Sequence, residues 1–317
     1  MKKISCLALF LSVASYTASA QLYISAGLGY AMPQAGQTMY DTPIPYNGFP
    51  TGFSGSRNNS TSASSYTYNI KSASFSSGVQ SAIGMGYMFS ENIGVQLDAS
   101  IGLSSTKYTF NDNNVNLNTA ASPVAGYINT TQQAKTPVLL MPALVLQTGG
   151  DKTNLYTRFG IALPLNTKIT QEQVMANAPG TGAIYVDDFT WQIKSSFSLG
   201  FTAAAGVRYK INDRFSIWGE LSLLSMSLNI KEQDLQSLTQ NGQSIPLSNY
   251  SYPTTIKFSK TATVDSNLAS FPTYSQPFSN IGLKVGVTFN LTEQKHNRHS
   301  RRNNDEDIDN TKPFKRR

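Results

Sequence analysis

Residues 197–211 carry the feature that most restricts how this chain can fold. Every second residue from Phe197 to Ile211 is apolar or aromatic, and the residues between them are small or polar and include Arg208 and Lys210. A period of two places alternate side chains on opposite faces of a strand, so the pattern indicates a β-strand and not a helix. A strand that crosses a membrane needs about 9–11 residues, with one face toward lipid and the other toward a polar lumen. The segment therefore predicts a membrane-spanning strand.

The sequence predicts eight such strands, because seven other segments repeat the alternation: residues 22–32, 78–89, 93–103, 138–148, 155–163, 215–223 and 281–291. Both faces of residues 138–148 are apolar, so their faces cannot be assigned, and Pro142 suggests a bulge there. The alternation slips at Leu223 and Leu224, which predicts another bulge. The outward register of the sixth strand continues back through Ile193, Trp191 and Phe189, which predicts that this strand projects beyond the bilayer.

The connections between these strands alternate in length. Long polar segments, predicted as loops, fall at residues 33–76, 104–136, 166–188 and 228–280, and the other three connections are tight turns. Bacterial outer-membrane barrels have short periplasmic turns and longer external loops. The fold class predicted is all-β: an eight-stranded antiparallel up-and-down transmembrane β-barrel, closed between its first and last strands. An aromatic girdle is predicted at the strand ends: Tyr30, Tyr87, Phe89, Trp191, Tyr209, Phe215 and Phe289.

Three regions follow from this pattern. Residues 1–20 predict a signal peptide, with Lys2 and Lys3 before an apolar stretch and Ala20 at a small-residue cleavage site. Residues 21–291 form the predicted barrel, and residues 292–317 a disordered, charged periplasmic tail. The one cysteine, Cys6, lies in the signal peptide, so the mature chain offers neither a disulfide nor a thiolate metal site.

The charges exclude several functions. The net charge of +7 falls to +2 for residues 21–291, with fifteen basic and thirteen acidic residues, so no nucleic-acid partner is expected. The two histidines, His296 and His299, lie in the tail, so we expect no histidine-dependent catalysis in the barrel, no enzyme activity, no cofactor and no metal. The tail predicts contacts with a periplasmic partner or peptidoglycan through its basic residues: Arg298, Arg301, Arg302, Lys315, Arg316 and Arg317.

A layer of charged side chains is predicted inside the barrel, because each lies in the lumen register at a similar depth: Asp98, Arg158, Arg208, Glu220 and Lys284. If Ile211 pairs with Phe215, Gly206 faces Glu220, which would then lie between Arg208 and Lys284. One interpretation is a set of buried ion pairs that fills the interior, since a buried charge requires a partner. The other is a polar constriction in a conducting pore.

The chain resembles the small outer-membrane β-barrels of the OmpA/OmpX/OmpW type, and most of all the "outer membrane protein beta-barrel domain" proteins of Bacteroidetes-like bacteria. The resemblance is carried by the first strand LYISAGLGY, the hairpin GVRYKINDRFSIWGEL and the last strand IGLKVGVTFNL. It implies location in the bacterial outer membrane, a monomeric barrel and contact with outer-membrane lipid or lipopolysaccharide. For function we expect a structural or interaction role, of an envelope or adhesion type, through external loops and tail. The alternatives are a channel for small solutes or hydrophobic molecules, and an accessory subunit of a larger envelope complex.

Overall fold

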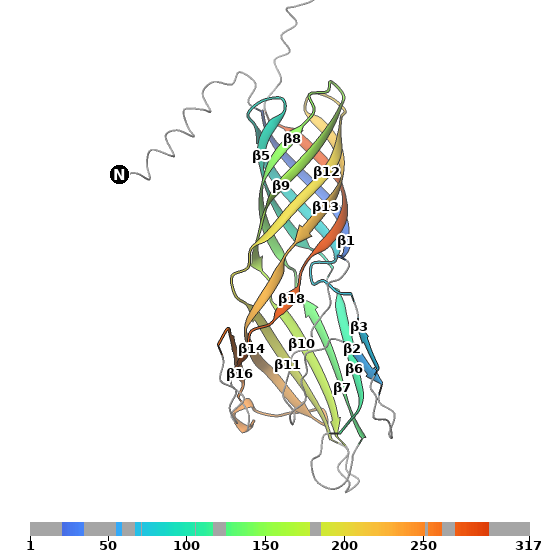
Figure 1. Cartoon of the computed structure of the whole chain (residues 1–317), viewed down its shortest axis with the longest axis vertical. Coiled ribbons are helices and arrows are strands. Elements are labelled where there is room, and N and C mark those ends of the chain that lie inside the picture. Colours follow the sequence, from blue (N-terminus) through green and yellow to red (C-terminus); the bar gives the residue numbers. More distant parts are fainter. Residues whose placement is uncertain are drawn as a thin grey trace, which may run out of the picture.

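The chain forms a closed β-barrel with a second β-sheet extending from one of its ends (Figure 1). This computed structural model describes residues 21–34, 55–58, 67–70, 72–104, 106–116, 125–177, 185–250, 253–261 and 270–291. Within these ranges no helix has the length and apolar character needed to span a membrane. The predicted signal peptide and tail lie outside the described residues.

The barrel confirms the prediction of eight antiparallel strands. Its strands, in the order in which they pair around the barrel, are β1 (Gln21–Pro33), β4 (Gly78–Met88), β5 (Ile93–Gly102), β8 (Val138–Gln147), β9 (Thr153–Asn166), β12 (Gly200–Lys210), β13 (Phe215–Ser225) and β19 (Asn280–Asn290). The barrel closes between the first and last of them, where Tyr23 pairs with Asn290 and Pro33 with Asn280. Closure leaves no sheet edge in the bilayer, where unpaired backbone groups could not be satisfied.

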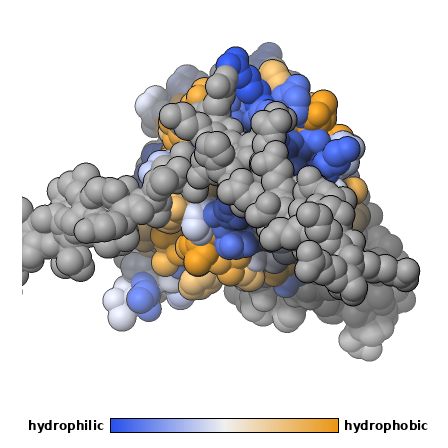
Figure 2. Space-filling view, turned by 90° about the horizontal axis from the view of Figure 1, so that it is seen from above, coloured by the Kyte–Doolittle hydropathy of each residue, from blue (hydrophilic) through white to orange (hydrophobic). Residues whose placement is uncertain are grey.

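The lipid-facing surface of the barrel is apolar, as the alternation predicts. Along β13, for example, Ile217 and Leu221 are exposed whereas Trp218 and Glu220 are buried. The structure also assigns the faces of β8, whose residues Leu139, Met141, Ala143 and Val145 point inward. Figure 2, a view from the end that carries the short turns, shows hydrophobic residues gathered on the flank of the barrel.

The prediction that the long connections are loops is wrong, because much of their length is folded into an eleven-stranded second sheet, which we call the external sheet. Its main strands are β2 (Gly55–Asn58), β3 (Thr67–Ile70), β6 (Lys107–Asn116), β7 (Ala125–Ala134), β10 (Ile169–Asn177), β11 (Tyr185–Ser195) and β14 (Ser227–Gln240). Smaller elements complete it: β15 (Gln243–Ser244), η2 (Leu247–Asn249), β16 (Thr255–Ser259), β17 (Ser270–Pro272) and β18 (Ser275–Pro277). Met226 alone separates β13 from β14, so barrel strands pass almost directly into the external sheet.

Apolar side chains on one face of the external sheet form a core that continues into the barrel mouth. Phe189, Trp191 and Ile193 of β11 are buried in this core together with Leu139 and Leu224 of the barrel. The prediction that these β11 residues continue the lipid-facing register of β12 is therefore wrong. Four residues separate β11 from β12, and β11 belongs to the external sheet, whose core buries these side chains.

Neither predicted bulge is found at the predicted position. Strand β13 keeps a regular register through Leu223 and Leu224. Leu224 is an inward apolar residue because it joins the core at the barrel mouth, which explains the slip in alternation. In β8 the pairing with β9 skips Met141 and Pro142 but resumes in register, and the register shift lies between Val138 and Leu139.

We expect Gly27→Ala to destabilise the barrel by about 1–3 kcal/mol, the usual cost of overpacking. A Cβ atom on Gly27 would lie 2.5 Å from the Trp218 ring, which is buried in the lumen and also lies close against Gly286. The matched control is Gly219→Ala, where the nearest atom would be 3.9 Å away. Urea unfolding of the detergent-solubilised protein measures both, and equal midpoints for the two variants would show that the Trp218 ring yields without cost.

Candidate functional site

The centre of the barrel lumen contains a buried ion-pair network around Arg158. The Arg158 guanidinium of β9 bonds to the Asp98 carboxylate of β5 through Nη1, and its Nη2 donates to Glu220 Oε1 at 2.5 Å and to Oε2 at 2.6 Å. The side chains of Asp98 and Glu220 are only 5% and 1% exposed. One cation therefore bridges two carboxylates across the barrel, from strands that are not neighbours in the wall.

Neutral side chains supply further hydrogen bonds to the two carboxylates. The Tyr156 hydroxyl donates to Glu220 Oε2 at 2.9 Å, and Gln96 Nε2 donates to Asp98 Oδ1 at 2.6 Å. Tyr23 in turn donates to Gln96 Oε1 at 2.8 Å. A buried charge is stabilised when it is both paired and hydrogen-bonded, and the Asp98 and Glu220 carboxylates meet both conditions.

The predicted register around Glu220 is confirmed, but the predicted partner is wrong. Gly206 does lie opposite Glu220. Arg208, however, is directed away from that carboxylate: its guanidinium lies 5.0 Å from the ring centroid of Tyr23 and 5.3 Å from that of Tyr156. These distances are within the range of cation–π interaction. Arg208 lies diagonally across the ladder from Glu220, within reach of contact. Its guanidinium instead stacks between the two tyrosine rings, nearer the short turns.

Lys284 is the remaining cation of the predicted layer. It lies directly opposite Glu220 in the pairing of β13 with β19, and it is buried. The lumen thus holds two carboxylates, and Arg158 and Lys284 are both placed beside Glu220. The five predicted lumen residues occupy two levels: Arg208 with its tyrosines, and the Asp98, Arg158, Glu220 and Lys284 level.

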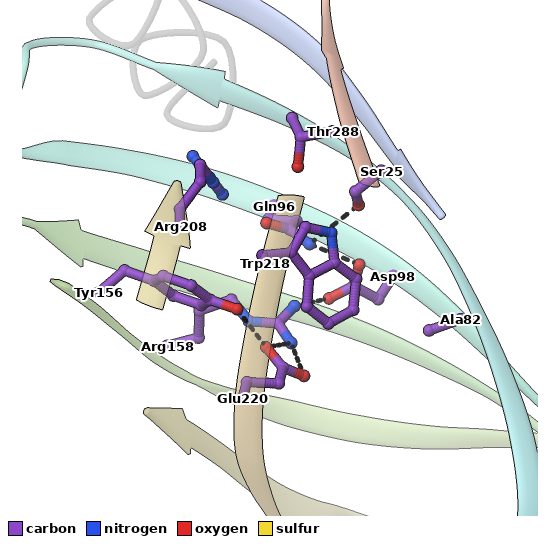
Figure 3. A pocket seen from close by; sticks show the side chains of 10 residues that line it. All are labelled: Ser25, Ala82, Gln96, Asp98, Tyr156, Arg158, Arg208, Trp218, Glu220 and Thr288. Carbon is purple, nitrogen blue, oxygen red and sulfur yellow. Dashed lines mark hydrogen bonds and ion pairs between the residues drawn. The ribbon is translucent and has the colours of Figure 1, made fainter. Parts of the chain in front are cut away.

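Figure 3 shows the side chains that line a pocket at this level of the lumen. The cavity enclosed by Asp98, Arg158, Glu220 and their neighbours has a volume of about 10 Å³. A buried water needs roughly 10–15 Å³, so the cavity accommodates one water at most. Side chains therefore fill nearly all of the lumen at this level.

The barrel is also filled at the end that joins the external sheet. Phe75 and Phe278 are buried there in the apolar core, and Ser76 Oγ donates to the Phe278 carbonyl at 2.5 Å. Asn280 Nδ2 donates to Ser76 Oγ at 2.7 Å. The segment around Ser76 belongs to a stretch predicted as a loop, and its Gly/Ser-rich composition gave no sign that it packs into the barrel mouth.

The aromatic residues predicted to form a girdle fall into three sets. Rings pair near the short turns, Tyr87 with Phe89 at 5.3 Å and Phe215 with Phe289 at 4.9 Å between centroids. Tyr30 and Tyr209 are exposed on the outside of the barrel. The prediction for Trp191 is wrong, because its side chain is 1% exposed and packs in the core of the external sheet, where it has no access to lipid.

The predicted contacts of the tail fall outside the part of the chain that the structure describes. They concern its basic residues, Arg298, Arg301, Arg302, Lys315, Arg316 and Arg317. Among the residues that are described, no group of three or more His, Cys, Asp or Glu side chains is arranged to hold a metal ion.

The family comparison agrees with the barrel. A family model described as "outer membrane protein beta-barrel domain" matches residues 4–244. Among solved structures, Ail, the attachment invasion locus protein of Yersinia pestis, is 7% identical with a TM-score of 0.29, over 86% of this chain and 98% of that one. A Pseudomonas aeruginosa FadL homologue is 10% identical with a TM-score of 0.18, over 88% and 91%. No curated protein matches the sequence.

Proposed function

The chain belongs to the outer membrane protein beta-barrel domain family, and on that premise we propose that it is a closed anchor that presents a folded sheet outside the cell for adhesive contact. The observation that supports this proposal best is the filling of the barrel at two levels. The Arg158 network occupies the centre, and the core around Phe75 and Phe278 occupies the mouth. A barrel filled in this way is suited to hold the external sheet in place and not to conduct solutes.

The position of the external sheet supports an outward role. Outer-membrane barrels place short turns in the periplasm and long connections outside. The external sheet is built from the long connections, so it projects from the cell surface. Its outer face carries polar residues such as Thr170, Thr190 and Gln192, as expected for a sheet with one face on a core and the other in water.

A closed anchor and a channel differ in the conductance they predict. We expect the purified, folded protein to leave planar bilayers electrically silent, because two packed levels would have to open for ions to pass. Folding is checked by the different gel mobilities of heated and unheated samples in detergent. Discrete, reproducible openings by the wild-type protein would overturn the closed-anchor proposal.

Adhesion is tested by a barrel-only variant, in which short turns replace residues 35–76, 104–136, 167–198 and 227–279. Leu139 and Leu224 are changed to Ser in this variant, because removal of the external sheet exposes them. We expect cells that express the full chain to attach to a solid surface or to each other several-fold more than cells that express the barrel alone. Equal attachment, with both proteins folded in the outer membrane, would contradict an adhesive role.

A further inference from the structure

Three lysines surround a surface hollow at the junction between the barrel and the external sheet. The hollow has a volume of about 280 Å³ and is lined by Lys168, Lys194 and Lys231, which we call the lysine cradle. Leu165 and Phe197 line the same hollow on its barrel side and are 65% and 80% exposed. Cations and large apolar side chains thus meet in one concave site at the level where the lipid-facing surface ends.

Strand pairing places two of the three lysines together. Ile169 of β10 lies opposite Ile193 of β11, and both are fully buried on the inner face. Because side chains alternate along a strand, the next residues, Lys168 and Lys194, lie side by side on the outer face. The two lysines are therefore fixed in one row by the same register that builds the core.

A β-bulge brings in the third lysine. In the pairing of β11 with β14, Lys194 lies opposite Glu232 and Ser195 opposite Ile230, so Lys231 is an extra residue without an opposite partner in the ladder. Lys231 is exposed while Ile230 is buried. Bulges commonly redirect a side chain near a functional site. Here the bulge turns Lys231 toward the row formed by the other two lysines.

The charge of the cradle is only partly neutralised. Lys194 donates to Glu232 at 2.8 Å and lies 2.5 Å from Asp234, and these hydrogen bonds raise the pKa of Lys194 above its usual value. Within the described part of the chain, neither Lys168 nor Lys231 forms an ion pair. The row continues beyond the cradle with the exposed residues Lys135, whose backbone N–H donates to the Lys168 carbonyl, and Lys257, opposite Glu232.

We propose that the lysine cradle binds the phosphate groups of a phosphorylated glycolipid of the outer leaflet, of the lipopolysaccharide kind, while its acyl chains contact Leu165 and Phe197. Lysine is a flexible point charge suited to phosphate, and its long stem can lie along apolar surface with the ammonium group in water. The apolar residues on the barrel side distinguish an amphiphile from a free anion. The proposal rests on the outward orientation of the external sheet but not on its adhesive role.

The test is binding of fluorescent lipopolysaccharide to the full-length protein in detergent. We expect Lys168→Gln/Lys231→Gln to weaken binding about tenfold, as the loss of two exposed charge contacts would, and to reduce its salt dependence. The matched control is Lys152→Gln/Lys210→Gln, which removes the same charge at the opposite end of the barrel and should bind like the wild type. Equal weakening by both pairs would mean non-specific attraction and would overturn the proposal.

Two further arms identify the ligand chemistry. Dephosphorylated lipopolysaccharide should bind the wild type about as weakly as the intact lipid binds the lysine variant. Phe197→Ala should weaken binding of the intact lipid, and inorganic phosphate at equal concentration should compete poorly. Strong competition by inorganic phosphate together with no effect of Phe197→Ala would instead indicate a simple anion site. Loss of lipid binding with cell attachment unchanged, or the reverse, separates this proposal from the adhesive function.

Discussion

Arg158→Met is expected to lower the free energy of unfolding of the barrel by about 3–5 kcal/mol, the cost of breaking a buried ion pair from one side. The substitution keeps much of the side-chain volume but leaves the Asp98 and Glu220 carboxylates without the cation that bridges them. Of the remaining cations, only Lys284 lies beside Glu220, and none lies beside Asp98 in the pairing of β4, β5 and β8. Urea titration of the folded protein in detergent, followed by tryptophan fluorescence, measures the change.

A double variant separates loss of charge balance from loss of packing. In Arg158→Met/Asp98→Asn the lumen keeps one carboxylate, Glu220, with Lys284 directly opposite it. We therefore expect the double variant to recover a large part of the stability that Arg158→Met loses. Residues in one network commonly show coupling of about 0.5–3 kcal/mol in such cycles. If the two substitutions instead destabilise additively, Asp98 and Arg158 are not coupled and the network does not act as a unit.

How far the sequence predicts this site can be judged from the two arginines. Alternation places Arg158 and Arg208 in the lumen, and the short turn at residues 211–215 fixes Gly206 opposite Glu220, so both inferences needed only local pattern. The choice between the arginines depends on the stagger of β5, β9 and β13 around the closed barrel, because that stagger sets which residues share a depth. A single strand pair does not determine it.

The external sheet escapes prediction for a different physical reason. Its strands are rich in Thr, Gln, Asn and Ser, and even its buried face contains polar residues. Gln132 of β7, for example, donates from Nε2 to Gln171 Oε1 of β10 at 2.7 Å inside the sheet. A buried amide pair of this kind is satisfied only by a neighbouring strand, so the pattern along one strand resembles a polar loop. The barrel strands are recognisable because their outer face contacts lipid. An unsatisfied polar group is costly in lipid, so that face stays apolar.

The second large effect is expected from Trp191→Ala in the external sheet, at a cost of about 3–5 kcal/mol to the stability of that sheet. Trp191 is fully buried and stacks on Phe189, with ring centroids 6.4 Å apart. The ring of Phe189 packs edge-on against that of Tyr250, with centroids 6.0 Å apart. Truncation of Trp191, the largest side chain in this core, leaves a cavity between the strands of the external sheet. The barrel, held by its own ladder in the membrane, should remain folded.

Trypsin treatment of intact cells measures this effect, because the lysines of the external sheet become cleavable when the sheet opens. We expect rapid cleavage of Trp191→Ala, and a protected barrel that still shows different mobilities when heated and unheated. Phe197→Ala is the control, since Phe197 is exposed and its loss should leave protease resistance unchanged. Because Leu139 and Leu224 share the core with Trp191, loss of the barrel together with the external sheet would instead mean that the two fold as one cooperative unit. A variant as resistant as the wild type would show that burial of Trp191 contributes little, and the core assigned to the external sheet would be wrong.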